Sequence, residues 1–228
     1  TCTNNFATMN PLDNYYQGST FSEGNLKIVT GSSSQSYNTS TMMVSSGKWY
    51  VECKVVSGSA TSNIGVVGEL SPATSGNNSQ IAYKTYGWAY IDSGLVWNNG
   101  SSVGGTWSSY TAGDIIGIAI NLDNTQGGLN KLYFSKNGVW QNGADPEDYT
   151  SVVGVVGITA PTSTTNGAYA FAMNETWNDN TKTFSWNFGS PEFTISSGNA
   201  DDNSYGNFEY DVPAGFFSLN TKNLAEYG

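Results

Sequence analysis

The residues of this chain that could perform acid–base or nucleophilic chemistry are few. Its 228 residues include 18 acidic side chains, eight basic ones and no histidine. Without histidine, Ser-His-Asp and Cys-His catalysis are excluded, and so are histidine-ligated zinc and the usual general base near neutral pH. Carboxylates are therefore the main remaining candidates for catalysis.

One short segment places two carboxylates at alternating positions. A retaining glycosidase needs two carboxylates about 5–5.5 Å apart, and Glu209-Tyr210-Asp211 comes nearest to an E-x-D-x-x-E pattern that could supply them. Ala214 stands where that pattern has its second glutamate, and Pro213 is unfavourable in a central strand. We therefore predict that the protein is not an enzyme, with a glycoside hydrolase as the remaining catalytic alternative.

A second acidic segment has the spacing of a calcium loop. Residues 201–206 (DDNSYG) match the D-x-N-x-x-G start of an EF-hand. The position of the bidentate glutamate is occupied by Val212, and no flanking helices are expected. The segment is more typical of a solvated loop of Asx turns. We predict no metal site and no cofactor.

Aromatic side chains are the best candidates for binding a partner. The chain has 7 Trp, 14 Tyr and 10 Phe, and exposed aromatic rings stack on sugars or anchor protein interfaces. Core packing is the competing interpretation, and we favour it for Trp49, Trp88 and Trp186. Binding residues are expected on or near loops carried by a rigid scaffold. The predicted partner contacts are Trp107, Tyr110, Trp177, Tyr90 and Trp97.

The overall composition is that of an acidic, globular β protein. Charged residues make up only 11% of the chain, and small polar residues mixed with aromatics are typical of short strands joined by tight loops. The formal charge of −10 disfavours nucleic acid phosphates and anionic membranes. No apolar run approaches the length of a membrane span. We predict one domain over residues 1–228, with no nucleic acid partner and no membrane insertion.

The two cysteines, Cys2 and Cys53, do not form the framework of a disulfide-rich secreted domain. Cys53 shares one face of its expected strand with Trp49, Val51 and Val55. This pattern favours a small, unpaired core residue over a Cys2–Cys53 disulfide, which stays the alternative.

The elements that must hold these residues are predicted to be strands. The clearest is 114–122, where Ile116, Ile118 and Ile120 face one way and small residues face the other, as expected for a central strand covered on both sides. Asn137-Gly138 predicts a type I′ hairpin, because both residues tolerate positive φ. Residues 220–227 are either a short helix or an exit segment that leads to a further domain.

The remaining strand signals recur at intervals of about 8–12 residues, which is typical of a β-sandwich. The fold class is therefore predicted to be all-β, a two-sheet antiparallel sandwich. Further strands are expected at 26–30, 48–56, 63–68, 80–84, 86–91, 95–97, 131–135, 151–159, 168–173 and 181–188, with loops that include 31–41 and 71–79.

Several short segments stand in a specific order along the chain: 47–52 (GKWYVE), 86–90 (YGWAY) with 97–100 (WNNG), 113–118 (GDIIGI), 122–123 (LD), 132–138 (LYFSKNG) and 184–193 (FSWNFGSPEF). As an ordered set they resemble the SPRY (B30.2) domain. The resemblance covers about residues 45–193 and implies a concanavalin A-like sandwich that binds a partner.

Two further segments flank this region, 6–12 (FATMNPL) and 215–224 (GFFSLNTKNL). They resemble the flanks of SPRY-like segments in bacteriophage virion proteins, in tails, fibres or head surfaces. The resemblance implies a non-enzymatic binding or structural module on the virion surface, in an extracellular setting. Its partners would be other virion proteins, or a glycan or protein of the host surface. A free carbohydrate-binding, lectin-like protein is the alternative.

Overall fold

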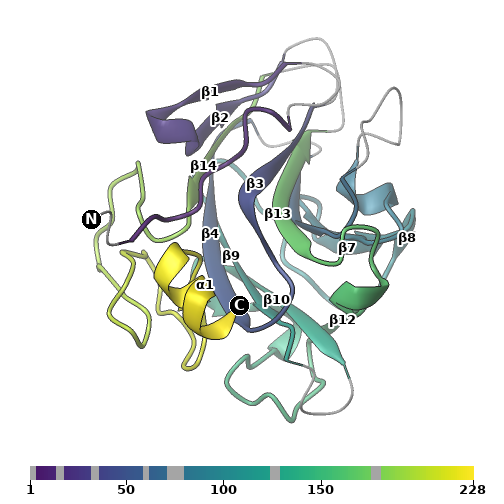
Figure 1. Ribbon diagram of the computed structural model, residues 1–228. Coiled ribbons are helices and arrows are strands. Elements are labelled where there is room, and N and C mark those ends of the chain that lie inside the picture. Colours follow the sequence, from purple (N-terminus) through teal and green to yellow (C-terminus); the bar gives the residue numbers. More distant parts are fainter. Residues whose placement is uncertain are drawn as a thin grey trace.

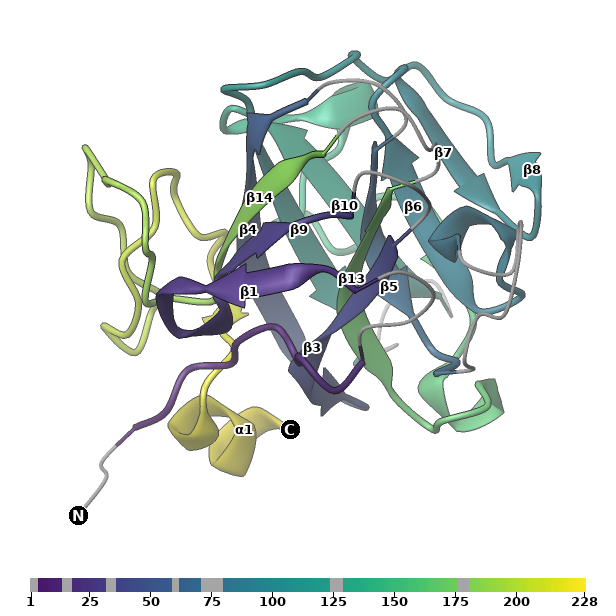
Figure 2. The same cartoon turned by 90° about the horizontal axis from the view of Figure 1, so that it is seen from above.

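The computed structural model describes residues 4–13, 18–31, 36–58, 62–70, 80–123, 129–175 and 181–228. In these ranges the chain forms two β-sheets packed face to face (Figures 1 and 2). The strand pairings are antiparallel except for that between β15 and β4. The predicted all-β, two-sheet sandwich is confirmed.

The larger sheet has the strand order β1-β2-β14-β4-β9-β10-β11, with β12 also paired to β10 and β15 to β4. Its strands are β1 (Thr20–Ser22), β2 (Lys27–Val29), β4 (Lys48–Ser57), β9 (Ile115–Asn121), β10 (Asn130–Lys136), β11 (Val139–Trp140), β12 (Val156–Ile158), β14 (Thr183–Asn187) and β15 (Phe217–Ser218).

The second sheet has the order β3-β13-β5-β6-β7-β8. Its strands are β3 (Ser36–Val44), β5 (Ser62–Val67), β6 (Gly87–Ile91), β7 (Leu95–Asn98), β8 (Ser101–Ser102) and β13 (Tyr169–Glu175). The described helices are the 3-10 helices η1 (Glu23–Asn25), η3 (Ile81–Tyr83), η4 (Gln141–Gly143) and η5 (Pro161–Ser163), and the α-helix α1 (Thr221–Tyr227).

The main hydrophobic core lies between the two sheets. Alternate residues of each strand point into it, as the period of two requires. The larger sheet contributes the predicted row Ile116, Ile118 and Ile120 of β9, and the second sheet contributes residues of β5, β6 and β13. The tryptophans predicted to be core residues, Trp49, Trp88 and Trp186, all lie in this cluster.

The predicted behaviour of Cys53 agrees with its position in β4. Cys53 is a buried, free thiol in the main core, and burial raises the pKa of that thiol. Its proposed alternative partner, Cys2, lies outside the described residues.

The C-terminal part of the chain covers the outer face of the larger sheet (Figure 2). There, Phe208 and Phe216 pack on Tyr50 of β4 and Tyr133 of β10. This second apolar layer explains why β9 is covered on both faces, as its sequence predicted.

A buried carboxylate fastens this covering segment to the sheet. Glu52 on β4 accepts hydrogen bonds from the backbone N–H groups of Glu209 (3.1 Å) and Tyr210 (2.9 Å), and from Asn187 Nδ2 (3.1 Å). It also accepts one from the Tyr50 hydroxyl at 3.1 Å. Burial raises the pKa of Glu52 above its ordinary value, although the hydrogen bonds from Tyr210 and Glu209 act in the opposite direction.

Because the pKa of Glu52 is raised, we expect its contribution to the free energy of unfolding to fall as pH rises. The folded protein binds the Glu52 proton more tightly than the unfolded chain does. The contribution of Glu52 is therefore fully present below the ordinary glutamate pKa and is lost as pH rises through the folded-state value. Urea unfolding of wild type and Glu52→Gln across that pH range should show a wild-type advantage that shrinks as pH rises. A difference that stays constant with pH would contradict the prediction.

The first and last described segments lie side by side. Ala7 N–H donates to the Leu219 carbonyl and Thr221 N–H donates to the Asn5 carbonyl, both at 2.9 Å. Asn220 caps α1 by accepting from the N–H groups of Lys222 and Asn223, which is a common role for asparagine. Of the two interpretations of residues 220–227, the short helix is thus confirmed.

Three sequence predictions differ from the structure. Residues 36–44 were expected mostly as loop but form β3, because polar side chains such as Asn38 and Thr39 are buried there. Residues 81–83 form a 3-10 helix rather than a strand. Within the expected strand 151–159, only Val156–Ile158 is extended and paired. The Asn137-Gly138 turn is confirmed, with φ values of 50° and 77°.

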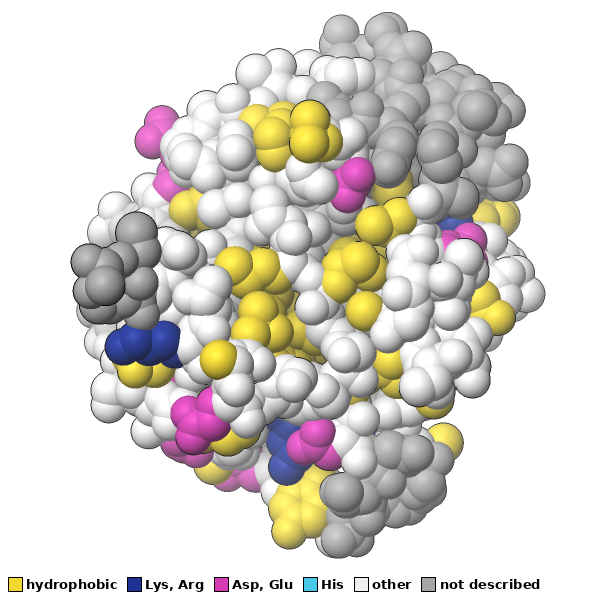
Figure 3. All heavy atoms as spheres, viewed as in Figure 1, with side chains coloured by type: hydrophobic (Ala, Val, Ile, Leu, Met, Phe, Trp, Pro, Cys, Tyr) yellow, Lys and Arg dark blue, Asp and Glu magenta, His cyan; other side chains and the backbone are white. Residues whose placement is uncertain are grey.

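The surface agrees with the low proportion of charged residues in the sequence, which is 11%. The face seen in Figure 3 is mostly uncharged, with a few scattered acidic and basic side chains. Within the described ranges, none of the helices has the length and apolar character needed to cross a membrane.

Candidate functional site

Three of the predicted contact residues come together, but inside the core. Trp107, Tyr110 and Tyr90 are 7%, 4% and 0% exposed. The ring of Tyr90 lies 5.7 Å from that of Trp107, 5.1 Å from that of Tyr110 and 5.4 Å from that of Phe134. In this position the three side chains offer almost no surface to a partner, which corrects the expectation that they form an exposed contact.

These side chains are buried because of the path that the chain takes after β8. Residues 103–113 lack regular structure, as predicted, but they place Trp107 and Tyr110 in the main core between the two sheets. Trp107 Nε1 donates to the Gly104 carbonyl at 3.0 Å, and Ser108 N–H donates to Gln141 Oε1 at 3.0 Å. The Tyr110 hydroxyl donates to the carbonyl groups of Ser62 and Tyr90. Burial raises the pKa of this phenol well above its ordinary value, so it remains a donor.

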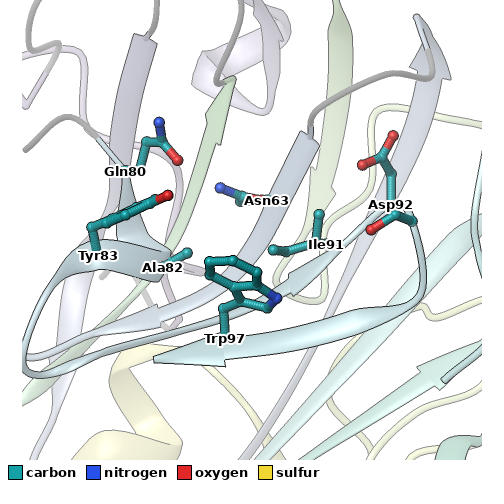
Figure 4. Close-up of a pocket in the computed structure, with 8 residues that line it drawn as sticks. Asn63, Gln80, Ala82, Tyr83, Ile91, Asp92 and Trp97 are labelled. Atoms are coloured by element: carbon teal, nitrogen blue, oxygen red, sulfur yellow. The ribbon is translucent and has the colours of Figure 1, made fainter. Parts of the chain in front are cut away.

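Of the other two predicted residues, Trp177 lies outside the described residues, and Trp97 lines a surface pocket of about 210 Å³. We call this the Tyr83–Trp97 pocket (Figure 4). It lies on the outer face of the second sheet, away from the main core. Its lining residues are Asn63, Gln80, Ala82, Tyr83, Ile91, Asp92, Ser93 and Trp97.

Two aromatic rings form the walls of the pocket. The centroids of Tyr83 on η3 and Trp97 on β7 are 6.1 Å apart, with the ring planes tilted by 49°. Both rings border the pocket, and the Tyr83 side chain is exposed. Aromatic faces at such an angle present a shallow, apolar corner to a ligand.

A tight turn holds the two rings in place. Asn99 and Gly100 connect β7 to β8 with φ values of 48° and 76°, which is the geometry of a type I′ hairpin. Gly100 N–H donates to the Ala82 carbonyl of η3 at 2.9 Å. A β-carbon on Gly100 would lie 3.3 Å from the Tyr83 ring, so glycine also leaves room for that ring.

Polar groups complete the site. Figure 4 shows Gln80 and Tyr83 on one side, Asp92 on the opposite side, and Asn63 and Trp97 between them. Asn63 Nδ2 donates weakly, at 3.3 Å, to Asn174 Oδ1. Its Oδ1 has no hydrogen-bond partner within the described part of the chain. Buried polar atoms are normally paired with protein or water, so an unpaired acceptor beside a pocket can accept from a ligand.

The two acidic segments noted in the sequence serve structural purposes. Asp201 is buried rather than solvated, and it accepts hydrogen bonds from Asn203, Tyr205, Ser218 and Asn223. Glu209 lies in an irregular segment, where a hydrogen bond from Ser196 lowers its pKa. Across the described ranges, no three acidic, histidine or cysteine side chains gather in a way that could hold a metal ion.

The fold was compared with known proteins. Neither a protein-family model nor a curated protein sequence matches this chain. Among solved structures, the SPRY domain of human HERC1 aligns with a TM-score of 0.56 and 17% identity, over 78% of this chain and 96% of that domain. The fold is a SPRY-like β-sandwich. Stonustoxin aligns with a TM-score of 0.51 and 19% identity, over 80% of this chain and 27% of its own.

Within this SPRY-like fold, sequence reasoning identified only one residue of the pocket. Tyr83, Gln80, Asn63 and Asp92 come from η3, β5 and the turn after β6, and no local pattern indicates that they meet. The one usable signal was the Asn99-Gly100 turn, which stands directly after Trp97-Asn98 and predicts a hairpin that carries the tryptophan.

Proposed function

We propose that this chain is a non-enzymatic recognition module on the surface of a bacteriophage particle. It would contact a glycan or protein of the host surface, or a neighbouring virion protein, in an extracellular setting. The observation that carries the recognition role is the Tyr83–Trp97 pocket, where a rigid sheet displays an aromatic pair beside polar groups. A concave site with apolar walls and a few converging polar groups is the usual form of a binding site.

The virion setting is supported by the flanking sequences. Residues 6–12 and 215–224 carry the resemblance to phage segments, and the two flanks are hydrogen-bonded to each other through Ala7 and Leu219. They therefore belong to one structural feature rather than to two independent tails. The acidic surface, with its formal charge of −10, would also keep particles dispersed.

Electron cryo-microscopy of particles from the native source tests the location. We expect density for this sandwich on the outside of the particle, with the outer face of β5, β6 and β7 either open to solvent or against another molecule. Particles that lack the chain, or that carry it on their inner surface, would contradict the proposal.

Binding of the purified chain to host cell envelopes and to particles tests the site. Tyr83→Ala should weaken binding at least tenfold, because it removes one wall of the pocket. Tyr149→Ala is the matched control, since Tyr149 is about as exposed but does not line the pocket. Equal binding by both variants would place the contact elsewhere on the molecule.

A further inference from the structure

The chemistry of the Tyr83–Trp97 pocket narrows the kind of ligand that it can accept. Its volume of about 210 Å³ is below the roughly 300–1,000 Å³ of pockets for drug-sized ligands. The pocket is therefore suited to a single ring or a single side chain.

The aromatic walls require a ligand with an apolar face. Tyr83 and Trp97 offer two tilted ring surfaces, and the base between them is lined by Ala82 and Ile91. A flat patch of C–H groups packs well against such surfaces. Both a sugar ring and an apolar side chain meet this requirement.

The polar groups distinguish between these two ligands. Gln80 is 9% exposed, lines the pocket, and its side chain makes no hydrogen bond within the described part of the chain. Its amide can both donate and accept. Asn63, which is 1% exposed, adds an unpaired Oδ1 acceptor at the base. An apolar side chain would remove the Gln80 amide from water without pairing it and would leave the buried Asn63 Oδ1 unpaired, which is unfavourable.

Hydroxyl groups match this arrangement. Each hydroxyl carries one donor and two acceptor lone pairs, so neighbouring hydroxyls on a ring can pair with the Gln80 amide and with Asn63 Oδ1. A pyranose combines such hydroxyls with C–H faces for Tyr83 and Trp97. One small molecule thus satisfies the walls and the polar groups together.

Charge limits the choice further. Asp92 is the only charged residue among those that line the pocket in the described part of the chain. A carboxylate or sulfate on the ligand would be repelled by this negative charge.

We infer that the Tyr83–Trp97 pocket binds one neutral sugar ring of a surface glycan, with the ring against Tyr83 and Trp97 and its hydroxyls on Gln80 and Asn63. The inference rests on the proposed recognition function and specifies its ligand. Acidic sugars are disfavoured by the negative charge of Asp92.

The test titrates the purified chain with glucose, galactose, mannose and N-acetylglucosamine, and with glucuronic acid as the anionic counterpart, using saturation-transfer NMR. We expect at least one neutral sugar to bind and glucuronic acid to bind at least tenfold more weakly. Gln80→Leu and Tyr83→Ala should each weaken the neutral sugar at least tenfold, whereas Tyr149→Ala should not. Denaturation curves verify that each variant folds.

Two results would overturn the inference. One is the absence of binding to any neutral sugar while the chain still binds host envelopes or particles, in which case the recognition function stands and its ligand is not a sugar. The other is sugar binding that survives both Gln80→Leu and Tyr83→Ala. If the chain binds neither sugars, envelopes nor particles, the proposed function fails as well.

Discussion

Lys182→Met is expected to lower the free energy of unfolding by about 3–5 kcal/mol, the usual effect of removing one partner from a buried ion pair. Lys182 Nζ lies 2.8 Å from Glu175 Oε1, and both side chains are buried. The Lys182 backbone is also fixed, because its N–H donates to Thr30 Oγ1 and its carbonyl accepts from Thr30 N–H. Since small domains are stable by only about 5–15 kcal/mol, the loss would be a large fraction of the total.

Urea denaturation measures the change in the free energy of unfolding. Two further variants show whether that change comes from the buried ion pair. Lys136→Met is the matched control, because the Lys136–Asp114 pair at 3.2 Å is partly exposed and should contribute only about 0–1 kcal/mol. The double variant Glu175→Leu, Lys182→Met should recover most of the lost stability, since no unpaired charge remains buried. If Lys182→Met lowers the free energy of unfolding by no more than Lys136→Met does, the buried Lys182–Glu175 ion pair is not a major source of stability.

Trp107→Ala is the second substitution with a large expected effect, again about 3–5 kcal/mol of unfolding free energy. Its ring packs against Tyr90 and, at 6.0 Å, against Phe134, so truncation would leave a cavity between the sheets. It would also remove the hydrogen bond from Trp107 Nε1 to Gly104. Thermal or urea unfolding provides the measurement.

A control from the same loop separates core packing from partner contact. Val103 is exposed, and Val103→Ala should change stability by no more than about 0.5 kcal/mol. A Trp107→Ala variant that keeps wild-type stability but loses binding to a partner would show that Trp107 is a contact residue after all, as its position in a loop of the sequence had suggested.

The parts of the fold that could be predicted are those in which side-chain pattern alone determines the environment. The alternating isoleucines of β9 and the Asn137-Gly138 turn are of this kind, because period and turn geometry are local properties. β3 could not be recognised, since its polar residues are buried only through distant partners. Asn10 N–H, for example, donates to the Thr39 carbonyl, and Asn38 Oδ1 accepts from Ser19.

The same distinction applies to the binding residues. Loop position suggested exposure for Trp107 and Tyr110, yet their loop turns both side chains into the main core. Trp97 was found because it is an aromatic residue next to a predicted loop. Gln80 was missed, since it approaches Trp97 only when η3 docks on the second sheet through the hydrogen bond from Ile81 N–H to Asn174 Oδ1. Asn63 was missed because it approaches Trp97 only through the pairing of β5, β6 and β7.

The pairing of residues 5–7 with 219–221 has a mechanical consequence. Because Phe6 and Asn220 form an antiparallel bridge, a polypeptide enters and leaves the sandwich at neighbouring points. If the sandwich were inserted in a longer chain, it would project to one side of that chain and would be joined to it only through these two neighbouring segments. Tension along that chain would act first on α1 and on this short paired strip, before it acted on β13. A force on the longer chain would thus act on the paired residues 5–7 and 219–221 before it acted on the Tyr83–Trp97 pocket.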